Sequence, residues 1–306
     1  SILYRTGVRY ESPKTKTGLQ KLIRLGIFLV MFAKVSTDTR FLEVEGGRVA
    51  YDDQGAGPLV VCMPSLGDVR AEYRFLRPQL LAAGFRVVTM DLRGQGESST
   101  TFTDYSSPAA GRDLLALLRH LDAGPAAVVA TSMAAGSAAW AAAQEPASVQ
   151  RLVLIGPFVR DHGSDRVLRL LLGVLLSRPW GAAFWTWYFP KFYPSARPAD
   201  FDGYRSHLRA NLNEPGRLEA LRAMMNRSDR VIEAALARVA APTLVVMGSR
   251  DPDFPKPAEE AAWIAERLKG TVLMLEGAGH YPQAEVPDQA GPAIVDFLEG
   301  GAAGAA

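Results

Sequence analysis

Three side chains whose types act together in nucleophilic catalysis each follow a predicted strand: Ser132, Asp251 and His280. A serine hydroxyl is a weak nucleophile until a base takes its proton. An imidazole does this near neutral pH, and a carboxylate fixes the imidazole tautomer and stabilises the imidazolium. The residue types therefore predict covalent catalysis through Ser132, with His280 as base and Asp251 as its acidic partner, if the fold brings the three loops together.

Ser132 stands at a change of pattern. A short apolar run at residues 126–130 predicts a buried strand, and the alanine-rich residues 133–143 predict a helix. A sharp corner between them would lift the hydroxyl out of the sheet, and the small residues Ala130 and Ala134 would let strand and helix approach closely. The alternative is that Ser132 only caps the helix, as serines in this position often do.

Asp251 and His280 also have structural alternatives. Asp251 precedes a proline, where an aspartate often begins a turn, and Asp253 and Asp161 are rival acids. His280 lies in a glycine-flanked loop after the predicted strand 271–275. The other histidines are His120 at a helix end and His162 and His207 in a helical region. Elimination therefore favours His280 as the base.

The elements that must position these residues alternate along the chain. A glycine turn at residues 46–47 joins two strands of a predicted antiparallel hairpin, and a regular series of strands and helices follows. The predicted strands are 58–63, 85–90, 126–130, 151–155, 243–247 and 271–275, and the predicted helices are 70–82, 108–121, 133–143, 257–268 and 288–298. This alternation predicts an α/β fold with a mostly parallel twisted sheet flanked by helices.

The alternation stops between residues 157 and 240, where the pattern is helical. Ligands of parallel sheets bind at the carboxyl ends of the strands, so we expect residues 157–240 to form a helical lid over residues 39–156 and 241–300, the catalytic core. The lid is rich in aromatic residues: Trp180, Phe184, Trp185, Trp187, Tyr188, Phe189, Phe192 and Tyr193. Core packing is the alternative for each one, but together they favour an apolar cavity and a hydrophobic substrate.

Residues 1–38 are an N-terminal extension whose role the sequence does not decide. The apolar residues 25–33 are too few to span a bilayer, but basic residues precede them as in a signal peptide. A packed amphipathic helix and non-native sequence ahead of Met31 are the alternatives. We expect a cytoplasmic protein, or a membrane-associated or secreted one if residues 1–33 are a native targeting segment, with membrane contact through residues 21–34.

The composition limits the classes of molecule that the protein is expected to bind. The 306 residues carry a net charge of +2 with no dense Lys/Arg block, which argues against nucleic-acid binding. Cys62 is the only cysteine, so neither an intrachain disulfide nor a cysteine-based metal site can form. We expect no metal and no cofactor, and the sequence gives no oligomeric state.

From about residue 41 to residue 298 the chain resembles the lid-bearing serine hydrolases of the α/β-hydrolase fold, which include esterases, lipases and C–C hydrolases. The matching segments are Met90-Asp-Leu-Arg-Gly-Gln-Gly-Glu-Ser98, the Ser132 corner, Gly248-Ser-Arg-Asp251 and Gly277-Ala-Gly-His280. The resemblance implies a catalytic triad with Ser132 at the nucleophile elbow, and a hydrogen-bonded turn around Asp91, Arg93 and Ser98. Ala130 and Ala134 replace the usual elbow glycines.

One segment departs from the family pattern. The family has His-Gly after its third strand, and this chain has Met63-Pro64. The resemblance implies an oxyanion hole, the pair of donors that stabilises the tetrahedral intermediate, formed by the backbone N–H groups of Ser65 and Met133. The Ser65 hydroxyl is expected either to contact the substrate or to serve only in the turn.

The expected activity is hydrolysis of a carboxylic ester of a hydrophobic small molecule. A serine at the elbow argues against dehalogenase and epoxide hydrolase chemistry, which uses an aspartate there in this fold. Thioesterase, C–C bond hydrolase and cofactor-free perhydrolase activities stay open. A hydrolase-fold ligand-binding protein with little turnover is the alternative from another class.

Overall fold

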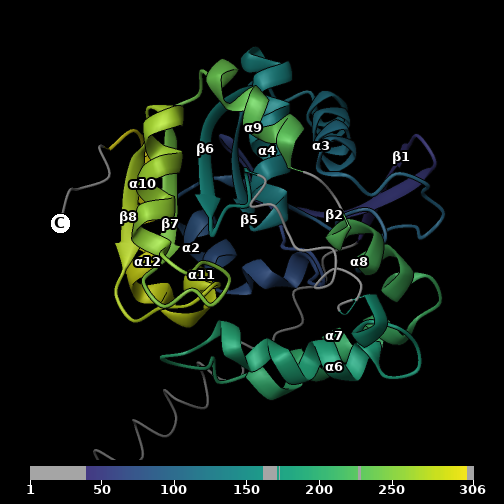
Figure 1. The fold of residues 1–306 in the computed structure, drawn as a ribbon. Coiled ribbons are helices and arrows are strands. Elements are labelled where there is room, and N and C mark those ends of the chain that lie inside the picture. The colour runs from purple at the N-terminus through teal and green to yellow at the C-terminus, as the bar shows by residue number, and fades with distance from the viewer. Residues whose placement is uncertain (1–38, 161–170, 172, 227–228, 302–306) are drawn as a thin grey trace, which may run out of the picture. The chain divides into compact units, whose positions relative to one another are not determined.

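The computed structural model describes residues 39–160, 171, 173–226 and 229–301. These residues form an eight-stranded sheet in the order β1-β2-β4-β3-β5-β6-β7-β8. β3 to β8 run parallel, whereas β1 and β2 pair antiparallel with their neighbours. The strands are β1 (Arg40–Val44), β2 (Gly47–Gln54), β3 (Leu59–Met63), β4 (Arg86–Met90), β5 (Ala126–Thr131), β6 (Val149–Ile155), β7 (Thr243–Gly248) and β8 (Thr271–Leu275). The predicted mostly parallel sheet is confirmed (Figure 1).

Helices cover both faces of the sheet. One face packs against α3 (Ser107–Leu121), α4 (Met133–Gln144) and α10 (Pro257–Leu268), and the other packs against α2 (Leu76–Ala82) and α12 (Pro287–Glu299). β3 shows why both faces are apolar: Val61 and Met63 join the first core, while Val60 and Cys62 join the second. Every residue of β3, β5 and β7 is buried, which confirms the buried strand predicted at residues 126–130.

The predicted helix at residues 70–82 is divided in the structure. A 3₁₀ helix, η1 (Arg70–Arg74), precedes α2, and Phe75 separates them. Pro78 has no N–H to bond a carbonyl one turn earlier, so it belongs in a first helical turn, where it lies in α2. The division matters because η1 turns Glu72 and Tyr73 into the interior.

Residues between β6 and β7 contribute helices and no strand within the described part of the chain. They are α6 (Gly181–Tyr188), η3 (Phe189–Phe192), α7 (Phe201–Asn213), α8 (Arg217–Met225), α9 (Arg230–Ala235) and η4 (Leu236–Arg238). α6, α7 and α8 lie beyond the carboxyl ends of the parallel strands (Figure 1), while α9 packs on α4. The division into core and lid, with a lid that covers a bound substrate, stays a prediction.

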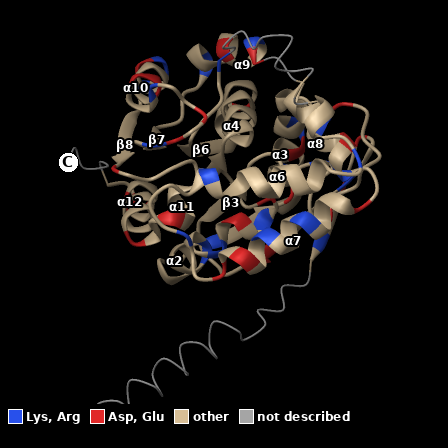
Figure 2. Ribbon diagram, turned by 60° about the horizontal axis from the view of Figure 1, so that its bottom comes forward, with Lys and Arg blue, Asp and Glu red and all other residues tan. Residues whose placement is uncertain are grey.

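The insertion has its own aromatic core. Trp185, Phe189, Phe192 and Tyr193 are buried there, whereas Trp180 and Trp187 are exposed. α6 carries no charged residue, while α7 carries both signs (Figure 2). Two short elements complete the described fold, η2 (Pro146–Ser148) and α11 (Pro282–Glu285).

No helix among the described residues is long and apolar enough to cross a membrane. Residues 1–38, which include the predicted membrane-contact segment 21–34, lie outside the described residues.

Candidate functional site

Ser132 occupies a sharp corner between β5 and α4. Its φ is +59°, a conformation that side chains other than glycine adopt at a cost. Its N–H donates to Ile155 O at 2.8 Å, and its carbonyl accepts the N–H groups of Ala135 and Phe158. Ser132 stands at the N-cap position of α4, but its side chain makes no capping hydrogen bond. A strained serine held by backbone bonds on both sides is the geometry expected of an elbow nucleophile.

Small residues let the corner close. Ala130 and Ala134 have no exposed surface, and Gly136 approaches Phe158 so closely that an added Cβ would lie 2.4 Å from its carbonyl oxygen. Alanines therefore fit at the two positions where the resembling family has glycines.

His280 and Asp251 form a buried pair. Nδ1 of His280 lies 2.7 Å from Oδ2 of Asp251, and the two residues are 1% and 3% exposed. Asp253 lies on the other side of the ring, with Oδ2 3.7 Å from Nε2. Ligand atoms of these three residues lie within 4.8 Å of one another, which is close enough for a cation. Asp251 thus contacts Nδ1, the ring nitrogen that an acidic partner holds in general-base chemistry, while Nε2 lies on the side of Asp253.

Two acidic neighbours control the charge of His280. Burial disfavours the imidazolium, but the negative charges of Asp251 and Asp253 and the Asp251 hydrogen bond outweigh burial and raise the pKa of His280 to about 9. His280 is therefore a strong base that is largely protonated at neutral pH.

Gly156 connects the pair to the corner. It follows β6 directly after Ile155, whose carbonyl holds the Ser132 N–H. A Cβ on Gly156 would lie 2.9 Å from the His280 ring and 3.1 Å from Asp251 Oδ2, and its φ is +50°. Ser132, Asp251 and His280 therefore converge around residues 155–156. Gly156 is not among the residues predicted from the sequence, although a glycine that ends a strand is a signal for such a close approach.

Glu285 holds the loop that carries His280. Its Oε2 accepts the Gly279 N–H at 2.6 Å, and its Oε1 accepts the Ser195 N–H at 2.6 Å and the Ser195 hydroxyl at 2.7 Å. The His280 N–H donates to Phe192 O at 3.0 Å. The histidine loop is thus attached to the helical insertion, and no sequence pattern indicated this role for Glu285.

The predicted oxyanion donors differ in their surroundings. Met133 opens α4, and N–H groups in a first helical turn have no acceptor within the helix. The Ser65 N–H instead donates to Oε2 of the buried Glu72 at 2.7 Å, and Ser65 Oγ lies 2.5 Å from the Tyr281 hydroxyl. The prediction assumed a free Ser65 N–H, and in the structure this group is bound to a carboxyl oxygen.

The segment from Asp91 to Ser98 forms a structural turn, as expected. Ser98 Oγ donates to Asp91 O at 3.1 Å and accepts the Ala50 N–H at 2.9 Å. Arg93 makes two 2.7 Å bonds to Asp113.

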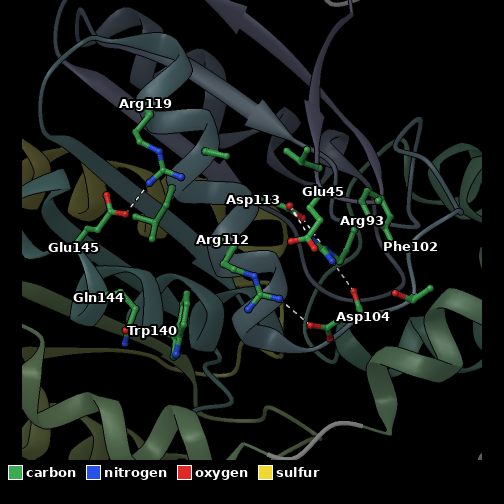
Figure 3. Close-up of a pocket in the computed structure, with 15 residues that line it drawn as sticks. Glu45, Arg93, Phe102, Asp104, Arg112, Asp113, Arg119, Trp140, Gln144 and Glu145 are labelled. Carbon is green, nitrogen blue, oxygen red and sulfur yellow. Dashed lines mark hydrogen bonds and ion pairs between the residues drawn. The ribbon is translucent and has the colours of Figure 1, made fainter.

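A separate cavity of about 710 Å³ lies between the β1 end, α3 and α4 (Figure 3). The arginines that line the cavity form ion pairs with acidic residues that also line it: Arg93 with Asp113, Arg112 with Asp104, and Arg119 with Glu145. Ser132, Asp251 and His280 do not line it. We assign no function to this cavity.

The remaining candidates lie elsewhere. His120 Nε2 is 3.2 Å from the Tyr51 hydroxyl, and His207 is exposed on α7. Asp161 and His162 lie outside the described residues.

Comparisons with known proteins agree with this geometry. The family model described as alpha/beta hydrolase fold matches residues 58–287. The chain is 25% identical over 288 residues to an uncharacterized protein of Mycobacterium tuberculosis, covering 85% of this chain and 80% of that one. It is 26% identical to a putative non-heme chloroperoxidase of Synechocystis, covering 82% and 95%.

Among solved structures, an esterase from Exiguobacterium antarcticum superposes with a TM-score of 0.74 at 18% identity. The superposition covers 85% of this chain and 98% of the esterase, and at this identity it shows the fold alone. The family match covers β3 to β8 and the loops of Ser132, Asp251 and His280, and the chain belongs to the alpha/beta hydrolase fold family.

Proposed function

We propose that the protein is a serine hydrolase that cleaves carboxylic esters of hydrophobic small molecules through a Ser132 acyl-enzyme. The observation that carries the proposal is the buried His280–Asp251 contact of 2.7 Å, which lies against Gly156, next to the Ile155 carbonyl that holds a serine with φ +59°. Family membership supports a hydrolase, while the choice of an ester is our inference.

The mechanism assigns one step to each group. His280 Nε2 takes the Ser132 hydroxyl proton as Oγ attacks the ester carbonyl, and Asp251 stabilises the imidazolium from Nδ1. The imidazolium then protonates the leaving alcohol, which departs and leaves the acyl group on Oγ. Water attacks the acyl-enzyme with His280 again acting as base, and the acid product and free Ser132 result.

Aromatic side chains near His280 support an apolar substrate. The rings of Phe158, Phe192 and Phe254 have centroids 5.4 to 6.5 Å from the His280 ring. These rings form an apolar surround for the base, which suits a hydrophobic acyl or aryl group better than a charged one.

Steady-state hydrolysis of p-nitrophenyl butyrate by wild type and Ser132→Ala tests the proposal. We expect turnover that is lost in Ser132→Ala, because the mutation removes the nucleophile. A panel of assays with thioesters, with vinylogous diketones and for peracid formation tests whether the same triad has thioesterase, C–C bond hydrolase or perhydrolase activity. Equal turnover in both proteins would refute the role of Ser132.

A second candidate is a hydrolase-fold ligand-binding protein with little turnover. The bond from the Ser65 N–H to Glu72 favours it, because a donor already bound to a carboxyl oxygen stabilises an oxyanion less well. Single-turnover acylation of Ser132 without a steady state on every substrate of the panel would select this candidate.

A further inference from the structure

Glu72 lies at the centre of a buried hydrogen-bond network below the elbow. It is 1% exposed and lies in η1. Its Oε2 accepts the Ser65 N–H at 2.7 Å, and its Oε1 accepts Gln283 Nε2 at 2.9 Å. Ser65 belongs to the predicted oxyanion loop, and Gln283 lies three residues after His280. One carboxyl group therefore joins two loops of the candidate site.

The same network reaches the elbow. Gln283 Nε2 also lies 3.4 Å from the hydroxyl of Thr131, the residue before Ser132. The Tyr73 hydroxyl lies 2.9 Å from the same Thr131 oxygen and donates to Met63 O at 2.7 Å. The Ser65 loop, the elbow and the segment after His280 thus meet in one set of buried polar contacts.

We propose that Glu72 is a positioning residue for the reaction proposed above: it holds the Ser65 amide in place and supplies a negative charge near His280. The proposal rests on the proposed function. Glu72 acts through Ser65 and Gln283, and through its negative charge on His280.

The surroundings of Glu72 determine the pH at which it becomes charged, and its charge in turn acts on His280. Burial, followed by the negative charge of Asp68, raises the pKa of Glu72 to about 8. A negative Glu72 in turn raises the pKa of His280. The titratable groups that act on Glu72 or respond to it are Cys62, Asp68, Tyr73, Tyr193, Tyr204, His280 and Tyr281.

Two substitutions separate position from charge. In Glu72→Gln the amide oxygen still accepts the Ser65 N–H, while the amide nitrogen faces Gln283. Gln283 Oε1 is buried and has no hydrogen-bond partner among the described residues, so a turn of the Gln283 amide lets it accept that new donor. Glu72→Gln therefore keeps the contacts and removes the charge, and Glu72→Ala removes both.

The experiment measures kcat, KM and the pH profile of kcat/KM for ester hydrolysis. The concentration of active sites is determined by titrating Ser132 with a fluorophosphonate, and kcat is calculated per titrated site. We expect Glu72→Ala to lower kcat at least about tenfold with KM nearly unchanged, because the Ser65 loop and the segment after His280 lose the carboxyl group that joins them, and the displaced groups act mainly in the transition state. Glu72→Gln should restore most of this loss. In both variants the rise of kcat/KM with pH should move to lower pH, because His280 loses a neighbouring negative charge.

Glu260→Gln is the matched control. It makes the same change in a carboxyl group that is 4% exposed and pairs with Arg160 on another face, and it should leave the kcat/KM profile in place. Wild-type kcat in Glu72→Ala, or an unmoved pH profile in Glu72→Gln, would overturn the positioning role while Ser132-dependent turnover persists. A wild-type protein without Ser132-dependent turnover would overturn the proposed function, and the role of Glu72 with it.

Discussion

At the scale of single residues, the central feature is a histidine between two carboxylates. Asp251 contacts Nδ1 at 2.7 Å, and Asp253 lies 3.7 Å from Nε2. Both aspartates lie in one loop after β7, and only the resemblance of Gly248-Ser-Arg-Asp251 to the family favoured Asp251 over Asp253. The choice depends on side-chain direction, because the two ring nitrogens of an imidazole have different tasks.

Asp251→Asn and Asp253→Asn should therefore have different effects. Asp251→Asn should lower kcat by about 10⁴-fold, because an amide stabilises the wrong imidazole tautomer. Asp253→Asn should keep most of kcat. Since Asp253 raises the pKa of His280, its loss lowers that pKa, and kcat/KM should reach its plateau at a lower pH.

Ester hydrolysis measured from pH 6 to pH 10 checks both expectations. In wild type, kcat/KM should rise with pH toward about 9, because only the neutral imidazole accepts the serine proton. A large kcat loss in Asp253→Asn with little loss in Asp251→Asn would reverse the assignment of the two acids.

At the scale of elements, strand ends decide where the site forms. Periodicity located most strands and helices, since continuous apolar runs and alternating helices carry strong signals. It missed the division between η1 and α2, and with it the inward direction of Glu72. It also missed Gly156, because the need for a glycine there comes from His280, a residue 124 positions later in the chain.

Gly156→Ala should reduce both stability and kcat. The alanine Cβ would lie 2.9 Å from the His280 ring, so the ring must move, and φ +50° adds backbone strain. Gly84→Ala is the control, because its φ is +86° but nothing lies within 4 Å of an added Cβ.

Measurements of Tm and kcat for the two variants distinguish backbone strain at the glycine from displacement of the His280 ring. Gly84→Ala should lower Tm and leave kcat unchanged, whereas Gly156→Ala should lower both. Full kcat in Gly156→Ala would show that His280 tolerates the added carbon and that the close approach has no catalytic importance.

At the scale of the whole molecule, the family fold was predictable and the buried acids were not. Local sequence patterns predict the order of the strands, the Ser132 elbow, Asp251 and His280 along the chain. Asp68 and Glu72 are buried against residues far along the chain, since Tyr204 of the insertion donates to Asp68 and Gln283 donates to Glu72, and no local pattern reports such contacts. Such burial has a consequence for stability.

Stability should fall as pH rises from about 4.5 to about 8. In the unfolded chain Glu72 loses its proton near the ordinary glutamate pKa of 4.5, while in the folded chain the pKa of Glu72 is about 8. Between these values the folded state binds more protons, so raising the pH favours unfolding. Glu72→Gln removes this contribution, so its Tm should decline less than that of wild type between pH 5 and pH 8. Parallel declines in the two proteins would contradict the raised pKa.

The central claim is that Ser132 is a nucleophile activated by His280. The most direct measurement treats wild type, Ser132→Ala and His280→Ala with a fluorophosphonate probe and locates the adduct by peptide mass spectrometry. We predict one adduct on Ser132 in wild type, none in Ser132→Ala, and labelling slowed at least about a hundredfold in His280→Ala, since the base no longer takes the proton. An unmodified Ser132 in folded wild-type protein, or an equal labelling rate without His280, would contradict the claim.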